Sequence, residues 1–149
     1  MGQTITLQPA YHPTRILRRR DEEVWIEEGD FSDYTRAADS CFDVVPGLTG
    51  SALSFRLHDD SSRYLRHRGG FCFVEENDES QVFKDDSTFV LLPGGLASSG
   101  VLAPPCVAFE AVNLPGFYLA HTDFRVQMLR FTDTEEFKQN ISWTTTKSS

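Results

Sequence analysis

The sequence predicts an all-β fold made of three similar units, and three observations lead to it. Similar residue patterns start at Ile5, Leu53 and Val107 and carry the same residue types at the same offsets. Short apolar runs alternate with polar residues, which is typical of half-buried strands. About four such runs fit into each unit, so about twelve short strands are expected. Three units of this kind predict a β-trefoil, in which a six-stranded barrel is capped by three hairpins and closure removes the sheet edges.

We name the units repeat one (residues 5–50), repeat two (53–97) and repeat three (107–146), and we expect a single domain over residues 1–149. The extra length between repeats two and three falls in a stretch rich in Gly and Ser, residues 93–100, which predicts a loop and not a domain linker. A sandwich of two sheets would not explain threefold repetition, and a three-bladed propeller would be too small.

The strands are predicted from alternation and from aromatic or β-branched runs. Leu53–Leu57 and Val107–Ala111 alternate with period two. The other strands predicted in repeat two lie at residues 64–67, 71–74 and 88–92. Turns are expected where Gly, Pro, Asp and Ser gather, at residues 59–62, 69–70 and 93–95. No helix of useful length is predicted, and residues 133–138 could form at most one helical turn.

Four positions recur in all three repeats. They hold Ile16, Tyr64 and Tyr118; Leu17, Leu65 and Leu119; Arg19, His67 and His121; and Phe42, Phe89 and Trp143. We expect the three leucines to form one layer of the core and the last aromatic trio to form another.

Composition and charge exclude several classes of function. The chain has 22 acidic and 14 basic residues and a net charge of −8, and such a surface repels nucleic-acid phosphates. No apolar run is long enough to span a membrane, and residues 1–20 lack the apolar stretch of a secretory signal, so a cytoplasmic location is expected. Cys41, Cys72 and Cys106 form no CxxC pair, so we expect thiols in a reducing compartment.

Repeat two carries the motifs that point to a family. Residues 63–68 read RYLRHR, residues 77–80 read NDES and residues 86–89 read DSTF, with Phe83 between the last two. This pattern resembles the repeat of the arabinofuranosidase B domain, the family-42 carbohydrate-binding module. Repeat three matches in part and repeat one is the most diverged. The resemblance implies a β-trefoil that binds arabinofuranose side chains of plant polysaccharides, with one shallow pocket in each repeat.

For repeat two, the resemblance implies a full set of sugar-binding residues, namely Tyr64, His67, Asp78 and Asp86. The chemistry agrees, because sugar hydroxyls can donate to a carboxylate and accept from an imidazole N–H. The apolar face of a sugar can also stack on an aromatic ring.

Repeat three is expected to be a weaker site. It keeps Tyr118 and His121, but Asn140 stands where the last Asp of the motif would be. Thr132 holds the place of the other acid, and Asp133 follows one step later. An amide can still bond a hydroxyl, but without the added strength of a charge.

Repeat one is not expected to bind sugar in the manner of the family. Ile16 and Arg19 stand in place of the Tyr and His, while Asp30 and Asp39 remain. We expect Arg19 to form an ion pair with one of these two carboxylates. In all repeats a structural interpretation stays open, because the Asp can hold a turn and the Tyr and His can serve packing.

Two hypotheses of function follow. The first is a non-catalytic carbohydrate-binding module that acts through sugar side chains and has its best site in repeat two. The second is an intracellular β-trefoil that binds a protein and keeps only relict sugar pockets. The missing secretory signal, the missing catalytic domain and the lost pocket of repeat one favour the second, and the complete motif of repeat two favours the first.

Other chemistry is not expected. The chain carries no catalytic signature, and the acidic run at residues 75–79 is typical of a solvated turn and not of a glycosidase cleft. His58, Asp59 and Asp60 lack further ligands at suitable spacing, so neither a metal nor a cofactor is expected. We expect a monomer.

Overall fold

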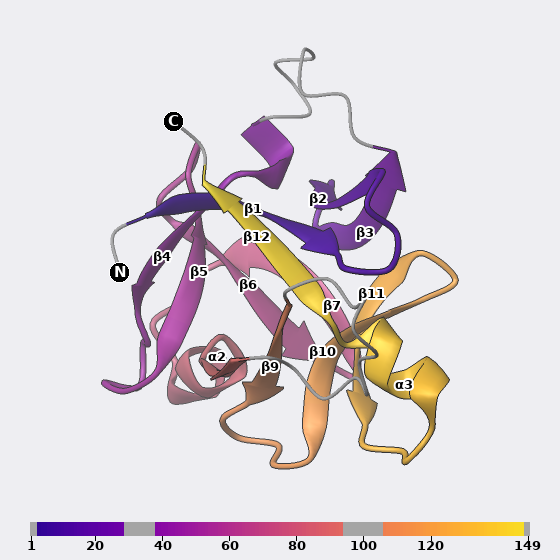
Figure 1. The fold of residues 1–149 in the computed structure, drawn as a ribbon. Coiled ribbons are helices and arrows are strands. Elements are labelled where there is room, and N and C mark those ends of the chain that lie inside the picture. Colours follow the sequence, from indigo (N-terminus) through magenta and orange to yellow (C-terminus); the bar gives the residue numbers. More distant parts are fainter. Residues whose placement is uncertain (1–2, 29–37, 94–105, 148–149) are drawn as a thin grey trace.

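The computed structural model describes residues 3–28, 38–93 and 106–147, which form an all-β fold with short helical segments (Figure 1). This confirms the all-β part of the predicted fold class. The elements are β1 (Thr4–Pro9), β2 (Arg15–Arg20), β3 (Glu23–Glu28), β4 (Phe42–Pro46), β5 (Leu53–Leu57), β6 (Arg63–Arg68), β7 (Phe71–Glu76), α2 (Gln81–Asp86), β8 (Phe89–Pro93), β9 (Val107–Ala111), β10 (Phe117–Thr122), β11 (Arg125–Arg130), α3 (Glu135–Asn140) and β12 (Trp143–Lys147).

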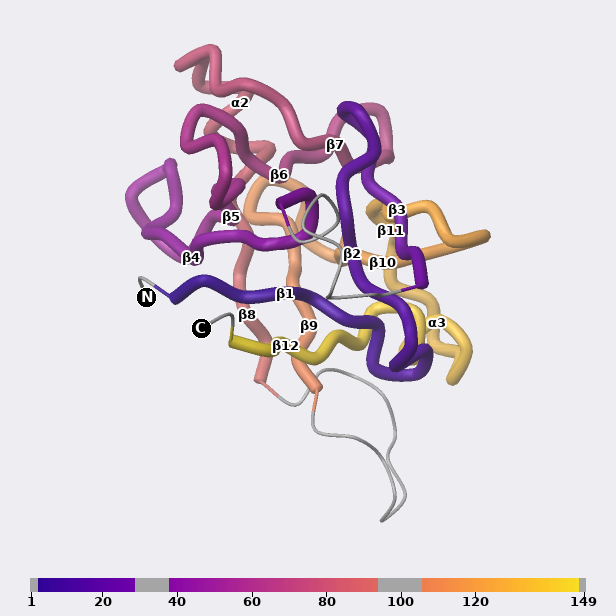
Figure 2. Tube along the Cα trace, turned by 90° about the horizontal axis from the view of Figure 1, so that it is seen from above, coloured from indigo at the N-terminus to yellow at the C-terminus, as the bar shows by residue number. Residues whose placement is uncertain are grey.

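Six of the strands pair in a ring that closes on itself. β1 pairs with β4, β4 with β5, β5 with β8, β8 with β9 and β9 with β12, all antiparallel. β12 returns to β1 over a register that runs from Ile5↔Lys147 to Pro9↔Trp143. These two strands lie side by side in Figure 1 and in Figure 2, which looks from above. The ring therefore joins the first and last strands that the structure describes.

The other six strands form three hairpins, β2–β3, β6–β7 and β10–β11. Each hairpin touches the other two, through the pairs Arg125↔Trp25, Gln127↔Phe71 and Glu23↔Phe73. The turn of β6–β7 consists of Gly69 and Gly70 at φ of 62° and 87°, a conformation in which a side chain would be strained. The sequence predicted this turn.

One apolar cluster fills the ring and the space under the hairpins. The three recurring leucines and the last aromatic trio are all fully buried members of it: Leu17, Leu65, Leu119, Phe42, Phe89 and Trp143. The indole Nε1 of Trp143 donates a hydrogen bond of 2.9 Å to the carbonyl oxygen of Leu119, so its one polar atom is satisfied inside the core. The residues at these two recurring positions are thus fully buried in all three repeats.

The prediction that no helix would be found beyond one turn at residues 133–138 was wrong. α2 and α3 each have six residues and precede the fourth strand of repeats two and three. Ser80 and Thr134 cap them by accepting from the backbone N–H groups of Phe83 and Phe137, whose rings are buried. Helices this short contain a single buried aromatic residue, so they leave no periodic apolar stripe in the sequence.

The three cysteines are thiols in the structure. Cys41, Cys72 and Cys106 form no disulfide bond, and burial raises the pKa of the Cys72 thiol. The predicted location in a reducing compartment stays a prediction. In the part of the chain that the structure describes, no helix is long and apolar enough to cross a membrane.

Candidate functional site

Repeat two brings two of its four predicted site residues, His67 and Asp86, close together. β6 carries Tyr64 and His67, and the last residue of α2 is Asp86. The His67 Nε2 and Asp86 Oδ1 atoms are 3.9 Å apart. Both side chains are largely covered, since His67 is 4% exposed and Asp86 is 8% exposed. The two groups therefore approach one another as predicted. Both side chains are buried, so little of either is exposed to a ligand in solvent.

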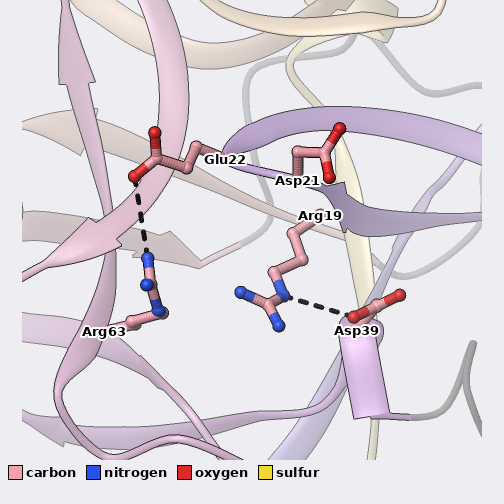
Figure 3. A pocket seen from close by; sticks show the side chains of 5 residues that line it. All are labelled: Arg19, Asp21, Glu22, Asp39 and Arg63. Atoms are coloured by element: carbon pink, nitrogen blue, oxygen red, sulfur yellow. Dashed lines mark hydrogen bonds and ion pairs between the residues drawn. The ribbon is translucent and has the colours of Figure 1, made fainter.

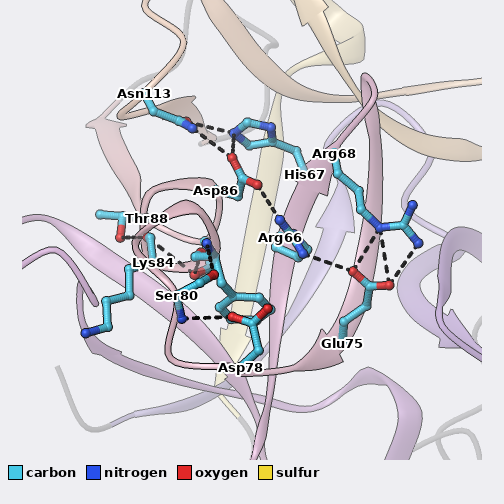
Figure 4. Close-up of polar contacts among 12 residues, drawn as sticks. Arg66, His67, Arg68, Glu75, Asp78, Ser80, Lys84, Asp86, Thr88 and Asn113 are labelled. Atoms are coloured by element: carbon cyan, nitrogen blue, oxygen red, sulfur yellow. Dashed lines mark hydrogen bonds and ion pairs between the residues drawn. The ribbon is translucent and has the colours of Figure 1, made fainter.

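Two further side chains complete this cluster, which we call the repeat-two cluster: His67, Asp86, Asn113 and Arg66 (Figure 4). His67 Nε2 bonds the Asn113 Oδ1 atom at 2.8 Å, and Asn113 Nδ2 donates to Asp86 Oδ1 at 2.8 Å. Arg66 Nη2 donates to Asp86 Oδ2. Each oxygen of the Asp86 carboxylate thus has a partner from within the chain.

Arg66 also ties the cluster to the neighbouring hairpin strand. Its Nη1 atom donates to Glu75 Oε1 at 3.3 Å, and Glu75 is held from its other side by Arg68. The hydrogen bond from Arg68, together with the positive charges of Arg68 and Arg66, keeps the pKa of Glu75 below its ordinary value. Arg66 therefore holds the Asp86 carboxylate in place, and Glu75 holds Arg66 in place.

Tyr64 and Asp78 stand differently from the prediction of an open platform. The Tyr64 ring is buried and packs edge-on against Phe83, with ring centroids 6.3 Å apart. Asp78 is exposed in the loop before α2, where its Oδ1 accepts from the Ser80 backbone N–H at 2.9 Å. Hydrogen bonds from Ser80 lower the pKa of Asp78. Asp78 thus holds the loop that leads into the helix cap.

Repeat three has the same Tyr–Phe and His–aromatic contacts as repeat two, but it lacks counterparts of the charged residues Arg66, Glu75 and Asp86. Tyr118 packs against Phe137 at 6.1 Å between ring centroids, and His121 lies against Trp143 at 5.8 Å. Burial, and secondarily the charge of His12, lower the pKa of His121 to about 4. Its Nε2 atom is buried and makes no hydrogen bond within the described structure.

The two polar residues predicted for repeat three do not flank His121 in the same way. Asp133 is highly exposed and pairs with Lys138 Nζ at 2.9 Å. Asn140 ends α3, at the place that Asp86 holds at the end of α2, and is half-buried. Ala120 and Leu129 stand where repeat two has Arg66 and Glu75, so the ion pair that holds Asp86 in repeat two has no counterpart in repeat three.

In repeat one, Arg19 forms the expected ion pair. Its Nε atom lies 3.2 Å from Asp39 Oδ1, and Arg18 Nη2 donates to the other oxygen of Asp39 at 2.7 Å. Asp30, the other predicted partner, lies outside the described residues. Ile16 is buried in place of the tyrosine.

Four neighbours of the sites were not predicted from the sequence, namely Arg66, Glu75, Asn113 and His12. For the first two a signal existed, because Arg18 and Glu27 occupy the same offsets in repeat one and also form an ion pair there, at 3.5 Å. Asn113 and His12 come from the turns of a different repeat and meet their partners only after the ring has closed. No sequence pattern signals that contact.

His58, Asp59 and Asp60 were predicted not to form a metal site. His58 Nδ1 lies 2.8 Å from Asp43 Oδ1, and no group of three or more potential metal ligands occurs among residues 3–28, 38–93 and 106–147.

Comparison with known proteins gives one matching family and a set of relatives. The family is described as the alpha-L-arabinofuranosidase B (ABFB) domain, and its profile matches residues 10–103 and 94–149. A probable alpha-L-arabinofuranosidase B of Aspergillus clavatus is 29% identical over 103 residues, which cover 66% of this chain and 19% of that protein. Its counterpart in Aspergillus terreus is 28% identical over the same shares. The chain thus spans about a fifth of the length of these relatives.

Solved structures show the same fold. An arabinofuranosidase in complex with arabinofuranosyl-alpha-1,2-xylobiose superposes with a TM-score of 0.81 at 20% identity, covering 97% of this chain and 30% of that one. The BEL β-trefoil superposes with a TM-score of 0.68 at 15% identity, covering 99% of this chain and 94% of that one. At these identities the likeness establishes the fold and nothing more.

Proposed function

Because the chain belongs to the alpha-L-arabinofuranosidase B domain family, we propose that it is a non-catalytic carbohydrate-binding module whose best site lies in repeat two. The observation that carries this proposal is the repeat-two cluster, in which His67, Asp86 and Asn113 converge at hydrogen-bond distances. The ligand class we propose is an arabinofuranose side chain of a polysaccharide.

The fold we propose in finer detail is a β-trefoil of three repeats. Two observations support it: the closed ring takes two strands from each repeat, and each repeat adds one hairpin that touches the other two. The position of the repeat-two site then recurs in each repeat, between β2, β6 or β10 and the segment before the fourth strand, although repeat one lacks the sugar-binding residues.

The repeat-two cluster has the chemistry that a sugar hydroxyl requires. Asn113 accepts from the His67 imidazole and donates to the Asp86 carboxylate, and one hydroxyl group of a sugar could make the same two bonds. Arg66 and Glu75 hold Asp86 in place, so little conformational freedom is lost when a ligand binds. The site is small, and we expect weak binding with a Kd of about 0.1–1 mM.

The test of this function is a titration of the chain with arabinofuranose oligosaccharides after a glycan-array screen. His67→Ala and Asp86→Asn should each weaken binding by about tenfold or more, because each removes a charge-assisted or well-oriented hydrogen bond. His58→Ala is the matched control, since this histidine is exposed and bonds Asp43 outside the cluster. Unfolding curves of each variant show whether the fold is kept.

The order of the sites is tested in the same titration. Asn140→Ala should leave the repeat-two site intact, because Asn140 belongs to repeat three. If Asp86→Asn leaves binding unchanged and Asn140→Ala abolishes it, the repeat-two assignment is wrong.

Asn113 offers a separate test, because its amide occupies the bonds that a hydroxyl would make. It lies on the exposed turn between β9 and β10, where a ligand can displace it. Asn113→Ala is expected to raise the affinity for arabinofuranose in the same titration, since no internal amide then competes. A loss of affinity would mean that Asn113 contacts the sugar itself.

A protein partner is the second candidate function, and one observation favours it. Both oxygens of Asp86 are already bonded within the chain and the Tyr64 ring is buried, as expected for a relict pocket. If no glycan that contains arabinose, galactose or xylose binds at millimolar concentration, the protein-partner hypothesis replaces the carbohydrate one.

A further inference from the structure

The end of the strand ring that lies away from the hairpins contains a hollow of about 260 Å³. We call it the barrel-end hollow, and its wall is formed by Ile5, Leu53, Val107, Val44, Leu91 and Thr145. The first three lie at the beginning of β1, β5 and β9, and each of the last three is the third residue of the fourth strand of its repeat. Each repeat contributes two of these residues, so the hollow lies on the axis of the ring.

The wall of this hollow is apolar and partly open to solvent. Leu91 is 42% exposed, and Leu53 and Val107 are half-buried. The buried rings of Phe55 and Phe109 close the floor and meet edge to face, with centroids 5.1 Å apart. None of the described residues that line the hollow is charged. An apolar pocket in the mouth of a β-barrel is a preferred place for a small ligand.

Two polar side chains join the apolar wall. Thr145 stands where the other two repeats have Val44 and Leu91, and Gln3 directly precedes β1. Both residues are exposed, and neither the Thr145 hydroxyl nor the Gln3 side-chain amide makes a hydrogen bond with another described residue. The hollow therefore offers hydrogen-bonding groups beside a surface that is otherwise apolar.

The hollow of repeat one, of about 380 Å³, differs in its chemistry (Figure 3). There Arg19 bonds Asp39, and Arg63 lies 3.7 Å from Glu22. The cations of that hollow have their partners within the chain, so we assign no ligand to it.

We infer that the barrel-end hollow binds a small neutral molecule that has an apolar ring of about six carbon atoms and one hydroxyl group. The volume is sufficient, because an apolar cavity of about 150 Å³ already holds benzene. The ring would lie against Leu53, Leu91 and Val107, and the hydroxyl would bond Thr145 or Gln3. An ionised ligand is disfavoured, because it would lose hydration without meeting an opposite charge. The inference does not depend on the proposed sugar site.

The experiment is an NMR titration of the full chain with benzyl alcohol, followed through methyl signals. The signals of Val44, Leu53, Leu91 and Val107 should shift with a Kd of about 1 mM or lower, and benzoate should bind at least about tenfold more weakly. Val82, which is 65% exposed on α2 and lies outside the hollow, is the internal control. Equal shifts at Val82 would show unspecific association, and equal binding of benzoate or no shift at all would likewise overturn the inference.

Variants at the exposed wall test the two parts of the ligand separately. Thr145→Val keeps the shape and removes the hydroxyl, so it should weaken benzyl alcohol by about threefold or more and leave toluene unchanged. Leu91→Asn should weaken both compounds by about threefold or more. Leu114→Asn, at an exposed leucine on the turn after β9, is the matched control and should change neither. Wild-type affinities in both wall variants overturn the assignment.

Discussion

His121 is the residue whose surroundings predict the clearest effect of pH on stability. It is buried against Trp143, its Nε2 atom makes no hydrogen bond in the described structure, and its pKa is lowered from 6.5 to about 4, chiefly by burial. In the unfolded chain the imidazole has its ordinary pKa, so the unfolded state takes up the proton first as pH falls. The neutral form therefore stabilises the fold above pH 6.5, and this contribution is lost between pH 6.5 and 4.

We expect the free energy of unfolding to drop by about 3 kcal/mol across that interval because of His121 alone. Urea unfolding of the wild type and of His121→Gln from pH 4 to 8 measures it, because glutamine carries no charge at any of these values. The variant should show a flatter profile, while carboxylates affect both proteins alike. Identical slopes between pH 4 and 6.5 would contradict the prediction.

At the scale of residues, the sequence predicted where site residues lie in the repeat better than it predicted their hydrogen-bond partners. His67 and Asp86 approach one another as predicted, because the repeat fixes the positions of β6 and of the segment before β8, whereas Tyr64 is buried against Phe83. The bonds of Asp86 to Arg66 and Asn113 were not predicted. Asn113 lies 46 residues after His67, and the two meet only through the ring of strands that joins the repeats.

The short helices are the elements in which local chemistry decides structure. Ser80 accepts from the backbone N–H of Phe83, and Thr134 accepts from that of Phe137, so each cap satisfies an N–H group that has no partner in the first helical turn. Ser80→Ala should lower the free energy of unfolding by about 1 kcal/mol, and so should Thr134→Ala. Chemical denaturation measures both.

The matched control for the caps is Ser61→Ala, an exposed residue in the turn before β6. We expect its effect to stay within about 0.5 kcal/mol. A cost of that size for Ser80→Ala would show that the hydrogen bond to Phe83 does not stabilise α2.

Strands were predictable and helices were not, for a physical reason. Leu53–Leu57 and Val107–Ala111 repeat their apolar residues every second position, and the structure contains both strands with these bounds. α2 offers one cap and one buried phenylalanine, which is a signal too short for a periodic pattern. Its existence depends on the pocket that the finished core provides for Phe83.

For the whole molecule, the three recurring leucines test whether the repeats are equivalent. Leu17, Leu65 and Leu119 are fully buried in one cluster. Replacing any one of them by alanine should cost about 2–5 kcal/mol, because the cavity adds to the lost burial, and the three costs should be similar. Urea unfolding of Leu17→Ala, Leu65→Ala and Leu119→Ala measures this.

Leu114→Ala is the control for this series, because Leu114 is an exposed leucine on a turn. If one of the three core variants costs no more than this control, the repeats do not contribute equally and the threefold trefoil must be revised.

The pairing of β1 with β12 has a consequence for how the protein is made. Until Trp143–Lys147 has left the ribosome, β1 and β9 each lack one neighbour of the ring, and their bare backbone groups can pair with other chains. Contacts between strands so far apart along the chain form slowly, and a partly closed ring exposes its apolar interior meanwhile. The ring of the domain therefore closes only after its final strand has left the ribosome, and the nascent domain needs protection from aggregation until that strand arrives.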